Sequence, residues 1–308
     1  MLRFLPMLGI LSVVSLVQSQ EVPKYYRDRT KILNMNLIKC QDKNKVFTNY
    51  RKNEYYNLSI DSEFGMPHIE VDFENNTFPL VFDFGNSDNI LITNAISEKV
   101  PFCKKNKTYT YTPNGEIRGE IQNIEIPKFK VFNRIFENEG GTLMDWSISS
   151  TSPINGLIGL KYLQNQLFTL DYENKLLAIT NRDFTFASSE KIELLSFPYH
   201  PYGIHFLGKV NGKEVIIYLD TGKSHSEINS NLVAQEDIVS DKSGSFYPEL
   251  IEVEIGSKSF SLEYARVNKL KRKIDSEYPI GMYIASDILK YITLSVNRIN
   301  DNNYLIFH

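Results

Sequence analysis

Two short apolar runs of the chain end in the same pattern, an aspartate followed by one variable residue and a glycine. The first run occupies residues 78–85 and contains Asp83, and the second occupies residues 215–222 and contains Asp220. An apolar run of this length that stops at a turn residue is typical of a buried strand. Two strands that each deliver a carboxylate to a glycine turn predict a pair of facing aspartates, which could share a proton and activate a water molecule.

The sequence signals around the two aspartates come in the same order in both halves of the chain. Each aspartate is followed by a polar turn with glycine, by a strand of alternating hydrophobicity, and by an apolar segment that runs into a short helical stretch. The matching segments of the first and second halves are 113–115 and 242–244, 124–126 and 253–255, and 156–163 and 282–289. This duplication predicts two similar lobes, with Asp83 and Asp220 side by side on a pseudo-twofold axis.

Three segments resemble the pepsin/retropepsin family of aspartic proteases. They are the apolar run that ends in Asp-Thr-Gly at 220–222, the Leu-Ile-Gly-Leu segment at 157–160, and the strand and turn with the sequence Phe-Thr-Leu-Asp-Tyr-Glu-Asn-Lys at 168–175. The lobe size is similar to that of the retroviral-type subunit, and the chain resembles exported two-lobed bacterial members of that type. The resemblance covers roughly residues 67 to 308.

The resemblance implies a mainly β fold, made of two pseudo-symmetric, acid-protease-like β-barrel lobes with a cleft between them. It also divides the chain. We expect a signal peptide at 1–20, an N-terminal extension at 21–66, a first lobe at 67–186 and a second lobe at 187–308.

In this family the two aspartates form the catalytic dyad, so Asp83 and Asp220 would activate the water that hydrolyses a peptide bond. Two carboxylates about 3 Å apart cannot both ionise, so the pair holds one proton and supplies both a base and an acid. The glycines let the two loops approach each other. The resemblance assigns the support of the dyad to Gly85, Thr221, Gly222 and Lys223. The peptide or protein substrate would lie under flaps, whose candidate residues are Tyr111, Gly115 and Gly244.

Three residues near the dyad depart from the family pattern. Phe84 stands where the first lobe should carry threonine, while Asn86 and Lys223 stand where a small residue usually follows the glycine. An ammonium within about 4–6 Å of the aspartates would favour their ionised forms, whereas a lysine directed to solvent would not. Two functions therefore stay open: an exported aspartic-type endopeptidase, and a catalytically weakened relative that binds peptides or a partner protein in the cleft.

The first residues have the features of a secretory signal peptide. Arg3 gives a positive start, residues 4–17 form an apolar core too short to span a bilayer comfortably, and residues 17–19 fit a cleavage site. We expect a secreted or periplasmic protein with no integral membrane segment after cleavage; the alternative is an uncleaved anchor. In an oxidising compartment Cys40 and Cys103, the two cysteines of the chain, would form a disulfide, with two free thiols as the alternative.

Charge and motif content argue against several other functions. A formal net charge of −3 gives no general attraction to nucleic acid, and the five histidines stand in no recognisable ligand motif, so we expect no metal and no cofactor. The Asp-Phe-Gly at 83–85 also occurs in protein kinases, but the other kinase motifs are absent. A P-loop ending at 222–224 would need glycine where the chain has Ile217. We expect a monomer.

Overall fold

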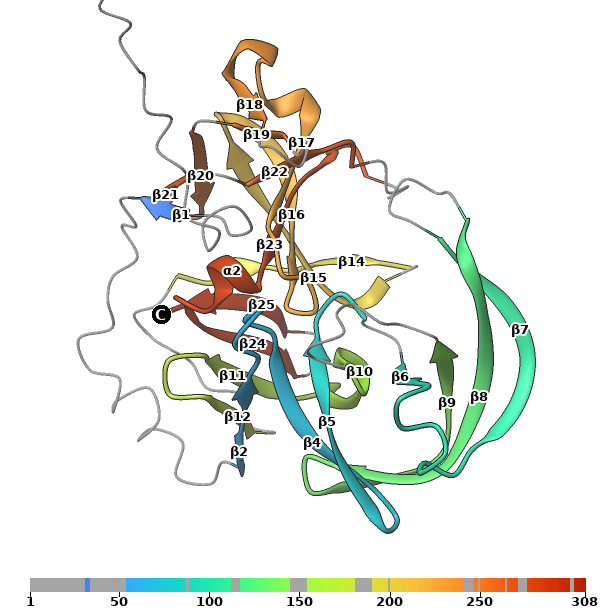
Figure 1. The fold of residues 1–308 in the computed structure, drawn as a ribbon. Coiled ribbons are helices and arrows are strands. Elements are labelled where there is room, and N and C mark those ends of the chain that lie inside the picture. The colour runs from blue at the N-terminus through green and yellow to red at the C-terminus, as the bar shows by residue number, and fades with distance from the viewer. Residues whose placement is uncertain are drawn as a thin grey trace, which may run out of the picture.

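The described part of the chain is built almost entirely of β-strands (Figure 1). Within it, helical structure is limited to one short α-helix, α2 (Ser286–Leu289), and three single 3₁₀ turns. The same part of the chain contains no helix of the length and apolar character that a bilayer crossing requires. The computed structural model describes residues 31–33, 54–86, 89–111, 117–144, 154–180, 190–198, 200–240, 246–248, 250–263, 265–270, 276–299 and 302–308.

The first half of the chain forms an eight-stranded sheet. Its strands in spatial order are β3 (Ser59–Ile60), β4 (Pro67–Phe73), β5 (Asn76–Asp83), β10 (Gly156–Gly159), β6 (Ile90–Thr93), β9 (Arg134–Met144), β8 (Ile117–Val131) and β7 (Cys103–Tyr111). β4 also pairs with β8, so the sheet closes on itself like a barrel. β7 and β8 form a long curved hairpin at the right of Figure 1.

Strands of the second half, joined at one edge by β1 from near the N-terminus, form a nine-stranded sheet. Its main path is β1 (Lys31–Leu33), β21 (Lys258–Glu263), β20 (Ile251–Ile255), β15 (His200–Val210), β16 (Lys213–Asp220), β23 (Ile280–Ala285), β17 (Glu227–Asn229) and β22 (Arg266–Asn268), and β14 (Leu195–Phe197) pairs with β15. A small separate sheet joins β18 (Ile238–Ser240) to β19 (Phe246–Pro248).

The two large sheets place their aspartates in equivalent positions. β5 ends at Asp83 and runs parallel to β10, with Gly159 opposite the aspartate. β16 ends at Asp220 and runs parallel to β23, with Ala285 opposite the aspartate. The structure thus shows the equivalence of Gly159 and Ala285 that the internal duplication indicates.

A third sheet joins the two halves. Its order is β13 (Ile192–Glu193), β25 (Asn302–Phe307), β24 (Thr293–Ile299), β11 (Leu167–Asp171), β12 (Leu176–Thr180) and β2 (Glu54–Asn57). The pairing of β11 with β24 connects the two halves directly. β2 and β3 lie within the segment predicted as an N-terminal extension, yet both pair with strands of the main body. The predicted boundary between the lobes, at residues 186 and 187, falls outside the described residues.

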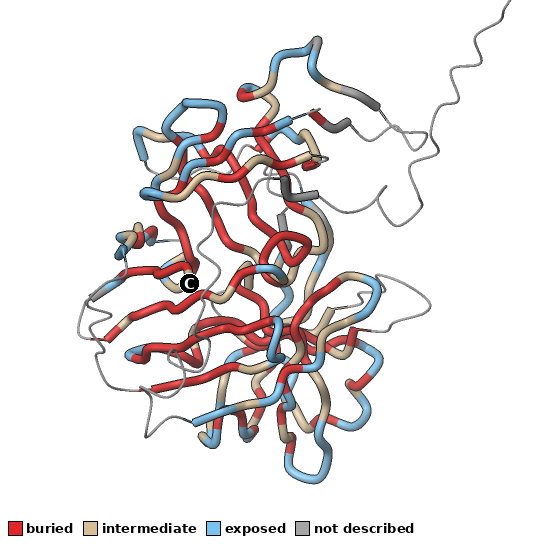
Figure 2. The backbone as a smooth tube through the Cα atoms, turned by 90° about the vertical axis from the view of Figure 1, so that its left-hand side faces the viewer, coloured by how far each residue is buried: buried red, intermediate tan, exposed pale blue. Residues whose placement is uncertain are grey.

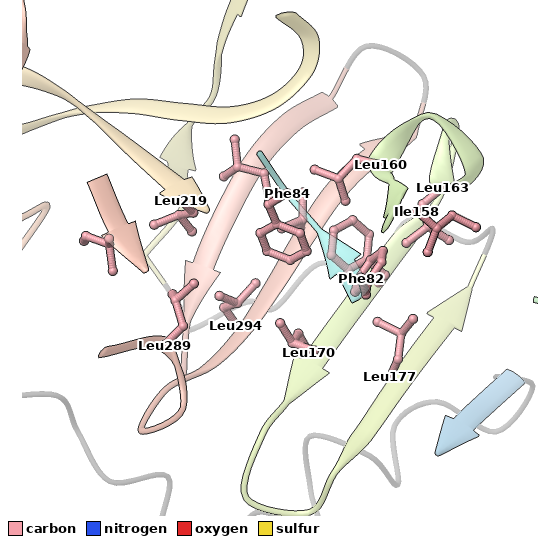
Figure 3. Close-up of a cluster of buried hydrophobic side chains, with 14 of the residues drawn as sticks. Phe82, Phe84, Ile158, Leu160, Leu163, Leu170, Leu177, Leu219, Leu289 and Leu294 are labelled. Atoms are coloured by element: carbon pink, nitrogen blue, oxygen red, sulfur yellow. The ribbon is translucent and has the colours of Figure 1, made fainter. Parts of the chain in front are cut away.

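The hydrophobic core is continuous across the three sheets. Figure 2 shows buried residues concentrated along the central strands, with exposed residues at the hairpin ends. In the close-up of Figure 3, Phe82 and Phe84 from the first sheet gather with Leu219 from the second and with Leu170 and Leu294 from the third. The prediction of a mainly β, two-lobed fold is confirmed, and this shared core fixes the ends of the strands that carry the two aspartates.

Candidate active site

Asp83 and Asp220 meet because each ends a strand that has a neighbour on both sides of it in its sheet. The two carboxyl groups are hydrogen-bonded to each other. Asp83 is only 6% exposed, and Asp220 is half-buried. The structure therefore brings together the two residues that the sequence predicts as a dyad. We call residues 83–86 the first aspartate loop and residues 220–223 the second aspartate loop.

The glycine of each aspartate loop lies against the aspartate of the other loop. A Cβ atom built on Gly85 would lie 2.5 Å from Oδ1 of Asp220, and a Cβ atom built on Gly222 would overlap the carboxyl group of Asp83. Neither glycine has the positive φ that favours glycine on conformational grounds. The requirement for glycine is therefore steric, since a larger residue at either position would separate the two carboxyl groups.

The surroundings of Asp83 favour its protonated form. Burial raises the pKa of the Asp83 carboxyl well above its usual range, and the charge of Asp220 raises it further. The N–H groups of Gly85 and Asn86 donate to this carboxyl and offset part of the rise, with Gly85 N at 2.7 Å from Asp83 Oδ1. The pair consequently keeps a proton at a pH at which an exposed aspartate would be ionised.

Thr221 ties the two aspartate loops together. Its hydroxyl accepts the N–H of Phe84 at 2.9 Å and donates to the carbonyl of Phe82 at 2.5 Å. The reverse bond is missing, because Phe84 has no hydroxyl and directs its ring into the core. That ring packs edge-on against the ring of Phe82, with centroids 5.3 Å apart, and against the ring of Phe168, with centroids 5.9 Å apart. Packing thus stands where the family pattern has a polar contact.

The second aspartate loop also receives hydrogen bonds from α2. Ser286, the first residue of α2, donates its hydroxyl to the carbonyl of Thr221 at 2.7 Å and its N–H to the carbonyl of Lys223 at 3.0 Å. The hydroxyl of Tyr172 lies 3.2 Å from that of Ser286. Burial raises the pKa of Tyr172, and the charges of Asp220 and Asp83 add to the rise, so this phenol stays neutral and can donate.

Asn86 and Lys223, which follow the loop glycines, carry no hydroxyl, and their side chains bond to other residues. The ammonium of Lys223 forms an ion pair with Glu227, with Nζ at 2.9 Å from Oε1, and lies 5.5 Å from the ring centroid of Tyr283. The ammonium is thus held by Glu227 and by the aromatic ring. The side-chain amide of Asn86 donates to the carbonyl of Asn89 at 2.9 Å.

The remaining predicted site residues are less completely described. Tyr111 ends β7 and pairs with Ile117 across the hairpin, which places it near the predicted flap tip. Gly115 and Gly244, the other flap candidates, lie outside the described residues, and so does Cys40. Cys103 is exposed at the start of β7. Among the described residues, no group of three or more His, Cys, Asp or Glu side chains is placed to hold a metal ion.

Two residues that contact the aspartate loops escape sequence reasoning. Ser286 lies one residue beyond the position equivalent to Gly159, and Tyr218 lies two residues before Asp220 on β16. The available signal is a difference between the halves: Tyr218 places a phenol in an otherwise apolar run, where the first half has Val81. Only the structure shows that this phenol is within hydrogen-bond distance of the first aspartate loop.

The fold is similar to that of a known class of enzyme. The aspartic proteinase from Irpex lacteus matches with a TM-score of 0.58 over 83% of this chain and 96% of that chain, at 12% sequence identity. At that identity the likeness establishes the fold alone, which is the pepsin-like aspartic proteinase fold. No protein-family model matches the sequence, and no curated protein matches it either.

Proposed function

We propose that the chain is an aspartic-type endopeptidase in which Asp83 and Asp220 activate water for peptide-bond hydrolysis. The observation that carries the proposal is the pair of carboxyl groups in direct hydrogen-bond contact, each packed against the glycine of the opposite loop. A structural ion pair would place a cation beside a carboxylate, whereas here the nearest charged neighbour of Asp83 is another acid. Such an arrangement is costly for folding and is typical of a proton-sharing catalytic pair.

The chemistry follows from one proton held by two carboxyl groups. The ionised carboxylate removes a proton from water, whose oxygen attacks the carbonyl carbon of the peptide bond, while the protonated carboxyl donates its proton to the carbonyl oxygen. The tetrahedral intermediate then breaks its C–N bond as one carboxyl of the dyad gives its proton to the leaving amine and the other carboxylate takes a proton from a hydroxyl of the intermediate. The two products are a carboxylic acid and an amine, and the pair again holds one proton.

A second function is favoured by what surrounds the dyad. Neither Asn86 nor Lys223 offers a hydroxyl, and their side chains are bonded to Asn89 and Glu227 instead. The side chain of Phe84 likewise supplies no hydrogen bond to the second loop, although its backbone N–H donates to Thr221. These replacements favour a catalytically weakened relative that binds an extended peptide or a partner protein across the same two loops.

Cleavage of a peptide library between about pH 3 and 7 separates the two functions. The wild type and Asp220→Asn are compared, with Asp72→Asn as a control because Asp72 lies in the half-exposed β4–β5 hairpin. An enzyme should cleave as wild type and as Asp72→Asn, and should lose cleavage as Asp220→Asn. Cleavage that survives Asp220→Asn would refute the dyad mechanism, and an absence of cleavage at every pH, with peptide binding retained, would support the binding function.

The proposed endopeptidase would also have a defined location, covalent structure and set of relatives. We propose export to a secreted or periplasmic location after removal of residues 1–20, a disulfide between Cys40 and Cys103, a monomeric state, and kinship with exported two-lobed bacterial proteins of retroviral type. Sequencing the N-terminus of the mature protein tests export. Mass spectrometry of unreduced peptides tests the disulfide, since a free Cys103 would carry an alkylating label.

A further inference from the structure

The hydroxyl of Tyr218 crosses from the second half of the molecule to the first aspartate loop. It lies 3.1 Å from the carbonyl oxygen of Phe84 and 3.2 Å from that of Gly85. A phenol has one hydrogen, so the two carbonyls share it as a three-centre bond. Tyr218 is 1% exposed, and its bond to the carbonyl of Phe84 is buried.

Both carbonyls belong to peptide units that donate to the dyad. The carbonyl of Phe84 and the N–H of Gly85 are the two ends of one peptide unit, and that N–H bonds to Asp83 Oδ1 at 2.7 Å. The carbonyl of Gly85 and the N–H of Asn86 are the two ends of the next unit, whose N–H also donates to Asp83. A hydrogen bond accepted by a peptide carbonyl polarises the unit and strengthens the donor at its other end.

We propose that Tyr218 is a positioning residue for the dyad: its one hydroxyl orients and polarises both peptide units that donate to Asp83. The inference rests on the proposed function for its catalytic meaning, although the hydrogen-bond chain can be measured without any activity. It also accounts for the absence of a hydroxyl at Phe84. The two side chains that bond to the first aspartate loop and its strand from the second half are Thr221 and Tyr218.

The ring of Tyr218 is fixed by its neighbours, which keeps the hydroxyl in place. It stacks on the ring of His205, with centroids 4.2 Å apart and planes 5° from parallel, and it meets the ring of Tyr283 edge-on at 5.2 Å. His205 is seated against Gly203, where a Cβ atom would overlap the imidazole. Arg298 in turn donates to the carbonyl of Gly203 at 2.8 Å.

Several charged and titratable groups surround this chain of bonds, among them Asp287 beside Tyr172, Tyr202 beside Arg298, and Tyr283 against the Tyr218 ring. Asp83 faces Asp220, and the phenol of Tyr172 lies close enough for both aspartates to raise its pKa. On the far side of the Tyr218 ring lies His205, with His200 beyond it at 6.3 Å between ring centroids. Two further groups near this cluster are Arg298, which is largely buried, and Lys223, which is paired with Glu227.

Replacing Tyr218 by phenylalanine removes the hydroxyl and leaves the stacked ring. The matched control is Tyr283→Phe, because Tyr283 belongs to the same buried aromatic cluster. The readout is the titration of the dyad, followed by NMR of ¹³C-labelled aspartate carboxyls. Asp83 is the carboxyl that keeps the proton, so its ionisation is the second ionisation of the dyad. Weaker donors stabilise ionised Asp83 less, so this second ionisation should move to higher pH in Tyr218→Phe and stay unchanged in Tyr283→Phe. A strengthening of about 10–30% in two charge-assisted bonds corresponds to about 0.2 to 1.3 pH units.

If the chain is an endopeptidase, the alkaline limb of its pH–rate profile should move to higher pH by the same amount. At a pH on that limb, kcat should rise by about 2- to 20-fold with KM unchanged, because the buried phenol touches no substrate. A protein without peptidase activity would contradict the proposed function, yet the carboxyl titration would still test Tyr218. An unshifted titration in Tyr218→Phe would overturn the inference whether or not the protein cleaves peptides.

A second substitution tests the same hydroxyl if Tyr218→Phe does not fold. Site-specific incorporation of 3-fluorotyrosine at position 218 retains the phenol and makes it a stronger donor. The second ionisation of the dyad, that of Asp83, should then move to lower pH, opposite to the change in Tyr218→Phe. A shift in the same direction for both variants would show that the aromatic packing, and not the hydroxyl, controls the dyad.

Discussion

Replacing Thr221 by valine should destabilise the protein far more than its small change in shape implies. Thr221 is fully buried, and its hydroxyl serves the N–H of Phe84 and the carbonyl of Phe82. Valine keeps the volume and leaves both groups without a partner. An unsatisfied buried backbone group costs about 1–3 kcal/mol, so with two such groups the free energy of unfolding should fall by about 2–6 kcal/mol. At about 2–4 °C per kcal/mol, Tm should fall by about 4–24 °C.

The control for this prediction is Thr221→Ser, which keeps the hydroxyl and loses one methyl group. Its expected cost is about 1 kcal/mol. Urea denaturation, followed by tryptophan fluorescence and by far-UV circular dichroism, measures both variants against wild type. If Thr221→Val and Thr221→Ser are equally stable, the hydrogen bonds of the Thr221 hydroxyl do not contribute to holding the two loops together.

Three further predictions concern the aspartate loops. Gly85→Ala should lower kcat at least about 100-fold, because the new Cβ displaces the carboxyl of Asp220, whereas Gly119→Ala, where nothing lies within 4 Å, should leave kcat unchanged. Asp83→Asn should stabilise the protein at neutral pH. Because the carboxyl pKa of Asp83 is raised in the folded protein, this group contributes its full stability only below the unfolded-state pKa of 3.8. That contribution is lost as pH rises through the folded-state pKa, and asparagine does not lose it. The gap between Asp83→Asn and wild type, measured by urea denaturation, should therefore widen from about pH 4 upward, and a constant gap would contradict the raised pKa. Phe84→Thr, which restores the residue of the family pattern, should nevertheless lower the free energy of unfolding by about 3 kcal/mol or more, because it empties the space that the ring fills between two other phenylalanines; an unchanged urea midpoint would show that this ring contributes little packing.

The pairing of the two aspartates could be predicted because its signals are local. Each lies at the end of an apolar run that becomes a strand with a neighbour on both sides, and each is followed by a glycine that the geometry requires. The repeated order of turns and strands then indicates that the two runs are equivalent. The residues next to Asp83 and Asp220 in the sequence therefore indicate the strand positions, the burial and the duplication.

The contacts that hold the dyad could not be predicted, since they depend on which side chains meet across the two halves. Lys223 follows its glycine directly, yet its direction is decided by Glu227, four residues further on at the start of β17, and by the ring of Tyr283. Tyr218 is an aromatic residue in a strand, which by itself indicates only packing. β2 offers no strong strand signal, and it becomes a strand by pairing with β12.

The third sheet has a consequence for biosynthesis. Thr169 on β11 and its partner Ser295 on β24 are 126 residues apart in the chain. At a translation rate of about 5–20 residues per second, β11 would wait for roughly 6 to 25 seconds before its partner strand is made. During that time the backbone donors and acceptors along one edge of β11 are unpaired, together with the apolar side chains of that strand. Such an edge invites association between nascent chains, so a chaperone that shields extended segments would be expected to raise the yield of this protein more than that of one whose sheets close within each half.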